Sequence, residues 1–346
     1  MGAPSAKSTS SSDAGGEAQG ASRVVVLRHD SAVLRGNPLG DPTARDLHVY
    51  LPPGYDESKR YPTLLAIVGF TGTGASLFNI DPLGENLQSR LDRLIASGKC
   101  PPLIVAAPDC FTRVGGNQYI DSVGTGRYEG YLLEEILPLV QERYAVGRWG
   151  VFGKSSGGYG SIVLGMRHPE IFQALADHSG DSNFELCYLP DFPDALDQFR
   201  EAGGPARWLE KFWADDNRHR RKYHKPLNII GMAAHYSPNP ESPHLGIDFP
   251  FDLETGEFRG EVWQRWRAWD PVQMVDRYRD NLKKLRLIYV DCGKRDEFSL
   301  VWGARALVAK LRAAGLEPHH EEFDDGHMSI SYRYDTSVPL LAKALS

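Results

Sequence analysis

The sequence predicts an α/β fold in which helices cover both faces of a doubly wound, mostly parallel sheet. Residues 63–68 and 103–107 are continuously apolar, as in strands that are buried on both faces of a parallel sheet. Segments with helical periodicity alternate with strand-like segments along most of the chain. Because such alternation is typical of strands joined by right-handed helical crossovers, it favours a doubly wound sheet.

The N-terminal region is expected to add antiparallel strands to this sheet. Residues 1–22 are rich in Ser, Gly and Ala and have almost no large apolar side chains, so we expect a disordered tail. Residues 23–27 form a β-branched run, and residues 46–51 alternate with a period of two. Both runs are interpreted as antiparallel edge strands, and a single domain is expected to span residues 23–346.

Further strands and helices follow along the chain. Residues 149–152 and 285–290 are predicted strands, and residues 319–323 look like a terminal strand. Helical periodicity predicts four helices, at residues 131–144, 159–167, 301–314 and 337–345.

Residues 183–270, the insertion, interrupt the alternation, because Pro, Trp and charged residues mix there without a clear strand. An insertion on the carboxyl side of the strands can form a cap over a pocket, with Trp213, Trp263 and Trp266 as candidates for substrate binding. It can equally form a satellite core of its own. Five of the seven tryptophans lie in this segment: Trp208, Trp213, Trp263, Trp266 and Trp269.

The composition excludes several classes of protein. The net charge of −6 argues against nucleic-acid binding, since phosphate contacts require a basic surface. No stretch approaches the roughly 18–20 apolar residues of a membrane span, and the N-terminus lacks the apolar core of a secretory signal. We therefore expect a cytoplasmic protein; a secreted form whose signal has been removed would have the same composition. The four cysteines are dispersed, without a CxxC pair or histidines at zinc-ligand spacing, so no metal or cofactor is implied.

A nucleophile elbow is predicted at residues 153–157, which read Gly-Lys-Ser-Ser-Gly and fit the pattern G-x-S-x-G of α/β-hydrolases. The motif follows a predicted strand and precedes a predicted helix, which is the context that the elbow requires. The turn is so tight that Gly153 and Gly157 are needed for space, while Ser155 is presented clear of the backbone. A phosphate-binding loop is excluded, because its first glycine would fall on Arg148.

A serine nucleophile needs a base and an acid that fixes the tautomer of that base. In α/β-hydrolases these residues follow in the chain order Ser, acid, His. Among the histidines near the C-terminus, His327 lies in a turn just beyond the predicted terminal strand, which makes it the candidate base. Asp296 lies in the loop after the late strand, where the acid belongs. Asp291, at the end of that strand, is the alternative, which we interpret as capping or orienting the loop.

Two backbone N–H groups are expected to stabilise a developing oxyanion. One belongs to Ser156, which follows the nucleophile at the start of a helix. The other is assigned to Phe70, in the loop after the first apolar strand, because Gly69 lets the chain turn and the next amide face the pocket. The alternative interpretation of this loop is a plain Gly/Thr turn.

These motifs resemble the putative-esterase family of α/β-hydrolases, which includes esterase D (S-formylglutathione hydrolase), feruloyl and acetylxylan esterases, enterochelin esterases and mycolyltransferases. The resemblance runs from residues 49–55 through 148–180 to the C-terminus. Residues 69–73, 291–298 and 326–327 are similar to the oxyanion loop, the acid loop and the base of esterase D in particular.

The resemblance implies the same triad of Ser155, Asp296 and His327. Two features depart from esterase D: Ser156 stands where a methionine is usual, and the insertion is longer. We predict a serine carboxylic-ester hydrolase that acts on a small-molecule ester through an acyl-enzyme. The alternatives are an acyltransferase with the same triad and a thioesterase of the S-formylglutathione hydrolase type. A catalytically inactive binding protein would be expected to lack a triad member, and all three are present.

Overall fold

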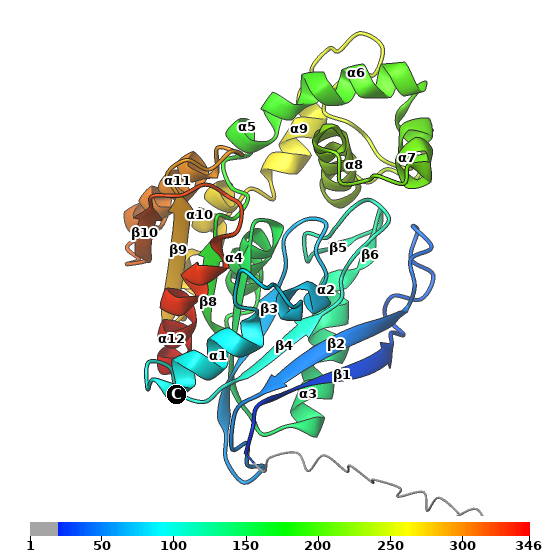
Figure 1. The fold of residues 1–346 in the computed structure, drawn as a ribbon. Helices are drawn as coiled ribbons and strands as arrows, with labels where there is room; N and C mark the ends of the chain where they lie inside the picture. The colour runs from blue at the N-terminus through cyan, green and yellow to red at the C-terminus, as the bar shows by residue number, and fades with distance from the viewer. Residues whose placement is uncertain (1–19) are drawn as a thin grey trace, which may run out of the picture.

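The computed structural model describes residues 20–346, and the protein is built on a sheet of eight strands in the order β1-β2-β4-β3-β7-β8-β9-β10 (Figure 1). The predicted α/β-hydrolase fold class is confirmed. Residues 1–19 of the predicted disordered tail lie outside the described residues. The strands are β1 (Arg23–Asp30), β2 (Ala44–Leu51), β3 (Tyr61–Ile67), β4 (Ile104–Pro108), β7 (Val146–Lys154), β8 (Phe172–His178), β9 (Leu287–Gly293) and β10 (His319–Phe323), with a small hairpin of β5 (Asp121–Ser122) and β6 (Gly126–Arg127).

The sheet is antiparallel at its N-terminal end and parallel elsewhere. Strand β2 pairs antiparallel with both β1 and β4, so of the two predicted edge strands only β1 lies at an edge, and the prediction is wrong for β2. From β4 to β10 all neighbouring strands run parallel. Strand β8 was not predicted, because Gln173, Asp177 and His178 give this buried strand a polar composition.

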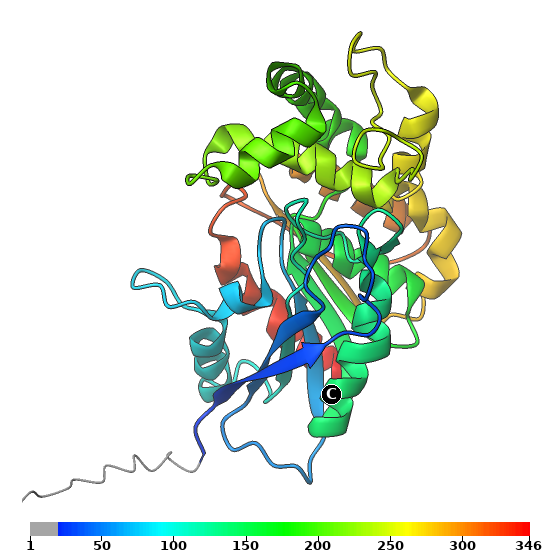
Figure 2. The same cartoon turned by 90° about the vertical axis from the view of Figure 1, so that its right-hand side faces the viewer.

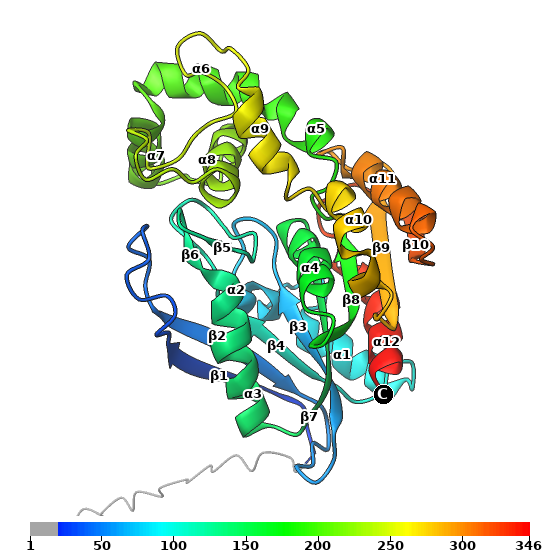
Figure 3. The same ribbon diagram turned by 180° about the vertical axis from the view of Figure 1, so that it is seen from behind.

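Helices cover the two faces of the sheet and enclose two apolar cores. Figure 3 shows α3, α4 and α10 on one face, and Figure 1 shows α1 and α12 on the other. A short α2 (Tyr128–Gly130) and a π-helical turn (Tyr131–Ile136) lead directly into α3. The covering helices are α1 (Leu87–Ala96), α3 (Leu137–Arg143), α4 (Ser156–Arg167), α10 (Pro271–Leu282), α11 (Leu300–Ala313) and α12 (Tyr334–Leu345).

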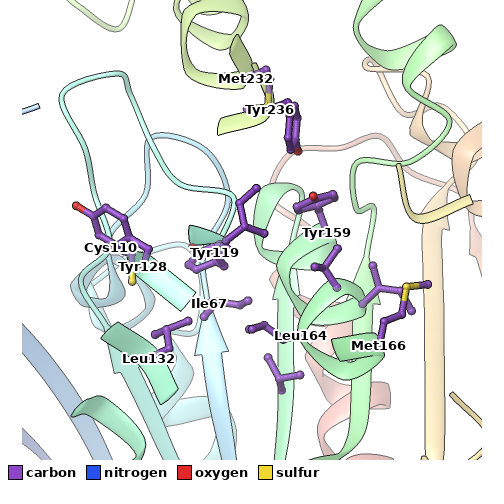
Figure 4. Close-up of a cluster of buried hydrophobic side chains, with 14 of the residues drawn as sticks. Ile67, Cys110, Tyr119, Tyr128, Leu132, Tyr159, Leu164, Met166, Met232 and Tyr236 are labelled. Carbon is purple, nitrogen blue, oxygen red and sulfur yellow. The ribbon is translucent and has the colours of Figure 1, made fainter. Parts of the chain in front are cut away.

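Between β8 and α10 the chain forms a helical layer above the carboxyl ends of the strands (Figures 1 and 2). Aromatic side chains fix this layer to the sheet domain. Figure 4 shows Met232 and Tyr236 above Tyr159 of α4, and the rings of Tyr236 and Tyr159 lie 6.0 Å apart. Over the described part of the chain, no helix has the length and apolarity that a membrane crossing needs. The helices of the layer are α5 (Phe184–Cys187), α6 (Phe192–Ala202), α7 (Pro205–Ala214), α8 (His224–Tyr236) and α9 (Gly260–Arg267).

Candidate active site

Ser155 lies on a strained turn between β7 and α4. Its φ of 58° and ψ of −126° are unusual for a residue with a side chain, which costs on the order of 1–3 kcal/mol. A Cβ on either Gly153 or Gly157 would come within 2.3 Å of the carbonyl oxygen of Ile67. Only glycine fits at these two positions, so the turn can pass this close to β3 and present Ser155 at the N-terminus of α4.

The sheet topology brings three sequence-predicted residues to one edge. Lys154, the last residue of β7, pairs with His178, the last residue of β8, and β9 and β10 continue in parallel beside them. Ser155 follows β7 directly, whereas Asp296 and His327 lie in the loops after β9 and β10. Because the carboxyl ends of parallel strands meet at one edge, all three residues lie at the edge that the insertion covers.

The His327 ring and the Asp296 carboxylate form a buried pair. Nδ1 of His327 lies 2.7 Å from Oδ2 of Asp296, and the two residues are 3% and 8% exposed. The other carboxylate oxygen accepts the N–H groups of Phe298 at 2.9 Å and Leu300 at 3.3 Å. Burial alone would raise the pKa of Asp296, but the hydrogen bonds from His327 and these N–H groups hold it below its ordinary value. The carboxyl is therefore ionised near neutral pH.

Asp291 belongs to a different buried cluster. Its Oδ1 lies 2.7 Å from Nδ1 of His178, whose Nε2 lies 2.8 Å from the hydroxyl of Ser337. Its Oδ2 accepts hydrogen bonds from Arg333 and Tyr289 at 2.8 Å each. Asp291 thus has a partner for each carboxylate oxygen, and Asp296 is the acid paired with His327.

The loop after β3 passes directly beside Ser155. A Cβ on Gly69 would meet Cβ of Ser155 at 3.2 Å and its Oγ at 3.8 Å. The next turn is fixed by Thr71, which has a φ of 67° and donates its N–H to the carbonyl oxygen of Gly115 at 2.7 Å. The loop therefore carries Phe70 past the candidate nucleophile, beside the N-terminus of α4.

The three tryptophans predicted as substrate contacts differ in burial and in their partners. Trp266 is fully buried and donates its indole N–H to Ser237, and Trp263, 4% exposed, packs against it. Both belong to the core of the insertion, so the expectation that they bind substrate is overturned by their burial. Trp213 is partly exposed, and its indole N–H bonds the carbonyl oxygen of Arg113, so it joins the insertion to a loop of the sheet domain.

Two side chains missed by sequence reasoning lie beside the candidate base. The ring of Phe298 lies 4.8 Å from that of His327, and the ring of His224, the first residue of α8, lies 5.0 Å from Phe298. Burial lowers the pKa of His224 to about 4, and the nearby His327 adds to this shift. His224 is therefore a neutral imidazole on the insertion that faces the candidate site. Nothing in the mixed composition of the insertion distinguishes it.

A cavity of about 580 Å³ lies within the insertion. Its lining combines apolar side chains such as Phe199 and Phe249 with charged ones such as Arg259. It contains none of the residues paired at the edge of the sheet, so it is separate from the candidate active site.

Comparison with known proteins assigns the family. The model of the Putative esterase family matches residues 42–335. The chain belongs to this family. Its mostly parallel sheet with helices on both faces is the α/β-hydrolase fold.

The individual relatives have low sequence identity to this chain. Dipeptidyl-peptidase 5 of Porphyromonas gingivalis is 29% identical over 233 residues, which cover 65% of this chain and 30% of that protein. The chain spans about a third of the length of the curated relatives it matches. A ferulic acid esterase has a TM-score of 0.61 at 20% identity, covering 94% of this chain and 99% of that one. An S-formylglutathione hydrolase from Agrobacterium tumefaciens has a TM-score of 0.56 at 19% identity, covering 95% and 98%. Both likenesses show the shared fold.

Proposed function

We propose that Ser155 is the nucleophile of a two-step ester hydrolysis, with His327 as its base and Asp296 as the acid that orients the base. The observation that carries the proposal is the 2.7 Å contact between Nδ1 of His327 and Asp296, at the edge where the strained elbow presents Ser155. An ionised carboxylate can only accept, so Nδ1 carries the proton and Nε2 is left as the acceptor. This is the tautomer that a serine hydroxyl needs.

The first step forms an acyl-enzyme. Nε2 of His327 takes the proton of Ser155 as Oγ bonds to the ester carbonyl carbon, and the carbonyl oxygen becomes an oxyanion. The N–H groups of Phe70 and Ser156 are assigned to hold that oxyanion. When the intermediate collapses, the bond to the alcohol oxygen breaks and the alcohol leaves with the proton from His327.

The second step repeats this chemistry with water. His327 takes a proton from water, whose oxygen attacks the acyl carbon; the bond to Ser155 then breaks, and the proton returns to its Oγ. Asp296 stays ionised throughout and stabilises the imidazolium formed in each step. Transfer of the acyl group to an alcohol uses the same residues, so the ratio of hydrolysis to transfer is a property to be measured.

Covalent labelling tests the proposed nucleophile. A fluorophosphonate should add to one serine with loss of fluoride, and mass spectrometry of the digested protein should place the adduct on Ser155. An adduct on another residue that abolishes turnover equally well would contradict the proposal.

A substrate panel tests the class of ester. Hydrolysis of p-nitrophenyl, feruloyl and thiol esters should be compared with and without an alcohol acceptor. Carboxylic esters should be turned over faster than thiol esters, and water should remain the main acceptor. A dominant transfer product would instead identify an acyltransferase.

A further inference from the structure

Four buried polar side chains form a connected chain beside the candidate nucleophile and have no part in the proposed steps. Nε2 of Gln118 donates to the hydroxyl of Ser156 at 2.9 Å, and that hydroxyl donates to Oδ2 of Asp181 at 3.3 Å. The phenol of Tyr188 donates to the same oxygen at 3.0 Å. The exposed fractions of the four side chains are at most 8%.

These residues come from four separate parts of the fold. Gln118 lies in a loop of the sheet domain, Ser156 is the first residue of α4, and Asp181 follows β8. Tyr188 directly follows α5 in the insertion and packs against Phe184 with ring centroids 4.7 Å apart. The chain of hydrogen bonds thus runs from the aromatic core of the insertion to the residue after Ser155.

The insertion also holds the other end of this chain. The backbone N–H of Gln118 donates to Nε2 of His235 on α8 at 3.3 Å. Nδ1 of His235 contacts the carbonyl oxygen of Gly231 at 2.7 Å, so Nδ1 carries the proton and Nε2 accepts. Burial lowers the pKa of His235 to about 4, which keeps this tautomer neutral.

We propose that Asp181 is a positioning residue: through the hydroxyl of Ser156 it holds the elbow in the orientation that aims the Ser156 N–H at the oxyanion, and through Tyr188 it ties that orientation to the insertion. The proposal rests on the proposed function, in which the Ser156 N–H is an oxyanion donor.

The geometry gives the Ser156 side chain one orientation. Its oxygen accepts from Gln118 and its proton goes to Asp181, so rotation about the Cα–Cβ bond would leave buried polar groups unpaired, at about 1–3 kcal/mol for each. Ser156 is also the first residue of α4, where a backbone N–H has no partner within the helix. A displacement of about 1 Å at such a donor can lower a rate by roughly 10²-fold.

Asp181 is suited to this role because one of its carboxylate oxygens accepts hydrogen bonds from two hydroxyls. Burial raises the pKa of its carboxyl, while the hydrogen bond from Tyr188, the nearby His327 and the hydrogen bond from Ser156 favour the charged form. An Asn at this position would offer an amide donor or a weaker acceptor to the same two hydroxyls. The isosteric change therefore tests the hydrogen bonds without removing volume.

The experiment compares Asp181→Asn, Ser156→Ala and Tyr188→Phe with a matched structural control. Asp270→Asn is that control, because Asp270 is also a fully buried carboxylate, and it accepts the N–H groups of Asn183 and Phe184 at 3.0 and 2.9 Å. For each variant, kcat and KM for a p-nitrophenyl ester, the rate of fluorophosphonate labelling and the Tm are measured.

We expect kcat and the labelling rate to fall by roughly 10-fold to 100-fold in Asp181→Asn and Ser156→Ala, with KM within about threefold of wild type. In Tyr188→Phe, which removes one of the two hydroxyls, kcat and the labelling rate should fall less. Asp270→Asn should lower the Tm and leave kcat within about twofold.

Variants that lower the Tm as the control does but keep the wild-type kcat would overturn the positioning role. If Asp181→Asn fails to fold, Tyr188→Phe decides, and a kcat equal to wild type in that variant overturns the proposal. Failure of the proposed function has a different signature, since wild type itself would then lack turnover or be labelled on a residue other than Ser155.

Discussion

In residues 20–346, two buried His–Asp pairs are each accompanied by a serine, and one of these pairs has the features expected of an active site. The His–Asp distance is 2.7 Å both in the pair of His327 with Asp296 and in the pair of His178 with Asp291. The second pair even has a serine hydroxyl, that of Ser337, 2.8 Å from the free ring nitrogen.

The difference lies in access and in the backbone. His178, Asp291 and Ser337 are all 0% exposed, and Ser337 lies inside α12, where the N–H groups are used by the helix itself. Ser155 lies instead on a strained turn ahead of a helix N-terminus, whose N–H groups are free to face an oxyanion. A hydrogen-bonded triad therefore identifies an active site only together with access for a substrate and donors for the charge that develops.

Replacement of Ser155 and of Ser337 should give the largest difference between the two sites, in activity for one and in stability for the other. Ser155→Ala should lower kcat by up to roughly 10⁶-fold and leave the Tm near that of wild type, because the mechanism has no other nucleophile. Ser337→Ala should keep kcat within about tenfold and destabilise the fold by about 1–3 kcal/mol, because it leaves His178 with an unpaired buried nitrogen.

Steady-state kinetics with p-nitrophenyl esters and thermal unfolding of both variants check this contrast. Activity of Ser155→Ala within tenfold of wild type would contradict the assignment of the nucleophile.

The two acids should differ in the same way. Asp296→Asn should lower kcat by roughly 10⁴-fold, because an amide no longer holds His327 in the required tautomer. Asp291→Asn should instead cost about 3–5 kcal/mol of stability, because it breaks a buried pair and removes a partner of Arg333. Kinetics and chemical denaturation on both variants are the measurements, and a larger loss of kcat in Asp291→Asn would exchange the two roles.

The first cluster could be placed from the sequence because its residues follow local rules. The elbow needs glycine at 153 and 157 for steric reasons, and these glycines are a pattern that any sequence displays directly. Loops after parallel strands end at one edge, so the order of the strands was sufficient to bring Asp296 and His327 together. In the structure, Nδ1 of His327 lies 2.7 Å from Oδ2 of Asp296.

The second cluster and the contacts of the insertion follow no such rule. His178 and Asp177 made β8 look too polar for a buried strand, because the partner of His178 lies far away in sequence: Asp291 is 113 residues from His178. Because β8 was not predicted, the sequence did not indicate that Asp181, which follows it, lies at the carboxyl edge of the sheet. Trp263 and Trp266 could not be assigned for a similar reason, since an aromatic side chain packs as well in a core as in a pocket, and only burial distinguishes the two.

Some residues of the insertion should stabilise its core, whereas others should contact the substrate. Trp266→Ala should destabilise the protein by about 3–5 kcal/mol and leave the ranking of acyl groups by kcat/KM unchanged, because the ring is fully buried in the insertion. His224→Ala should shift that ranking by several-fold and change stability by less than about 1 kcal/mol, because this partly exposed ring faces the site. Unfolding and a panel of p-nitrophenyl esters test both, and an unchanged ranking in His224→Ala would make it a packing residue.

Asp177 and Asp291 are buried acids on adjacent strands, and their pKa values are shifted in opposite directions. Burial, together with repulsion from Asp291, raises the pKa of Asp177 to about 8. Burial acts the same way on Asp291, but His178, Arg333 and Tyr289 outweigh it and hold the pKa of Asp291 below its ordinary value. The first acid is thus neutral and the second charged at pH 6, although the two strands that carry them are adjacent.

These shifts give stability contributions of opposite sign with pH. The folded state keeps the proton of Asp177 up to about pH 8, whereas the unfolded chain loses it near pH 4. Its contribution is therefore complete below about pH 4 and is lost as the pH rises towards 8. Asn is neutral at every pH, so the free energy of unfolding of Asp177→Asn relative to that of wild type should rise from pH 5 to pH 8, by on the order of a few kcal/mol. The Tm of the variant relative to wild type should rise with it. Asp291→Asn serves as the contrast, because the contribution of a lowered pKa is present above about pH 4 and is lost only in more acidic solution. Thermal unfolding of both variants across this range decides the matter: a constant difference for Asp177→Asn would mean that Asp177 is ionised in the fold and has a partner that offsets its burial.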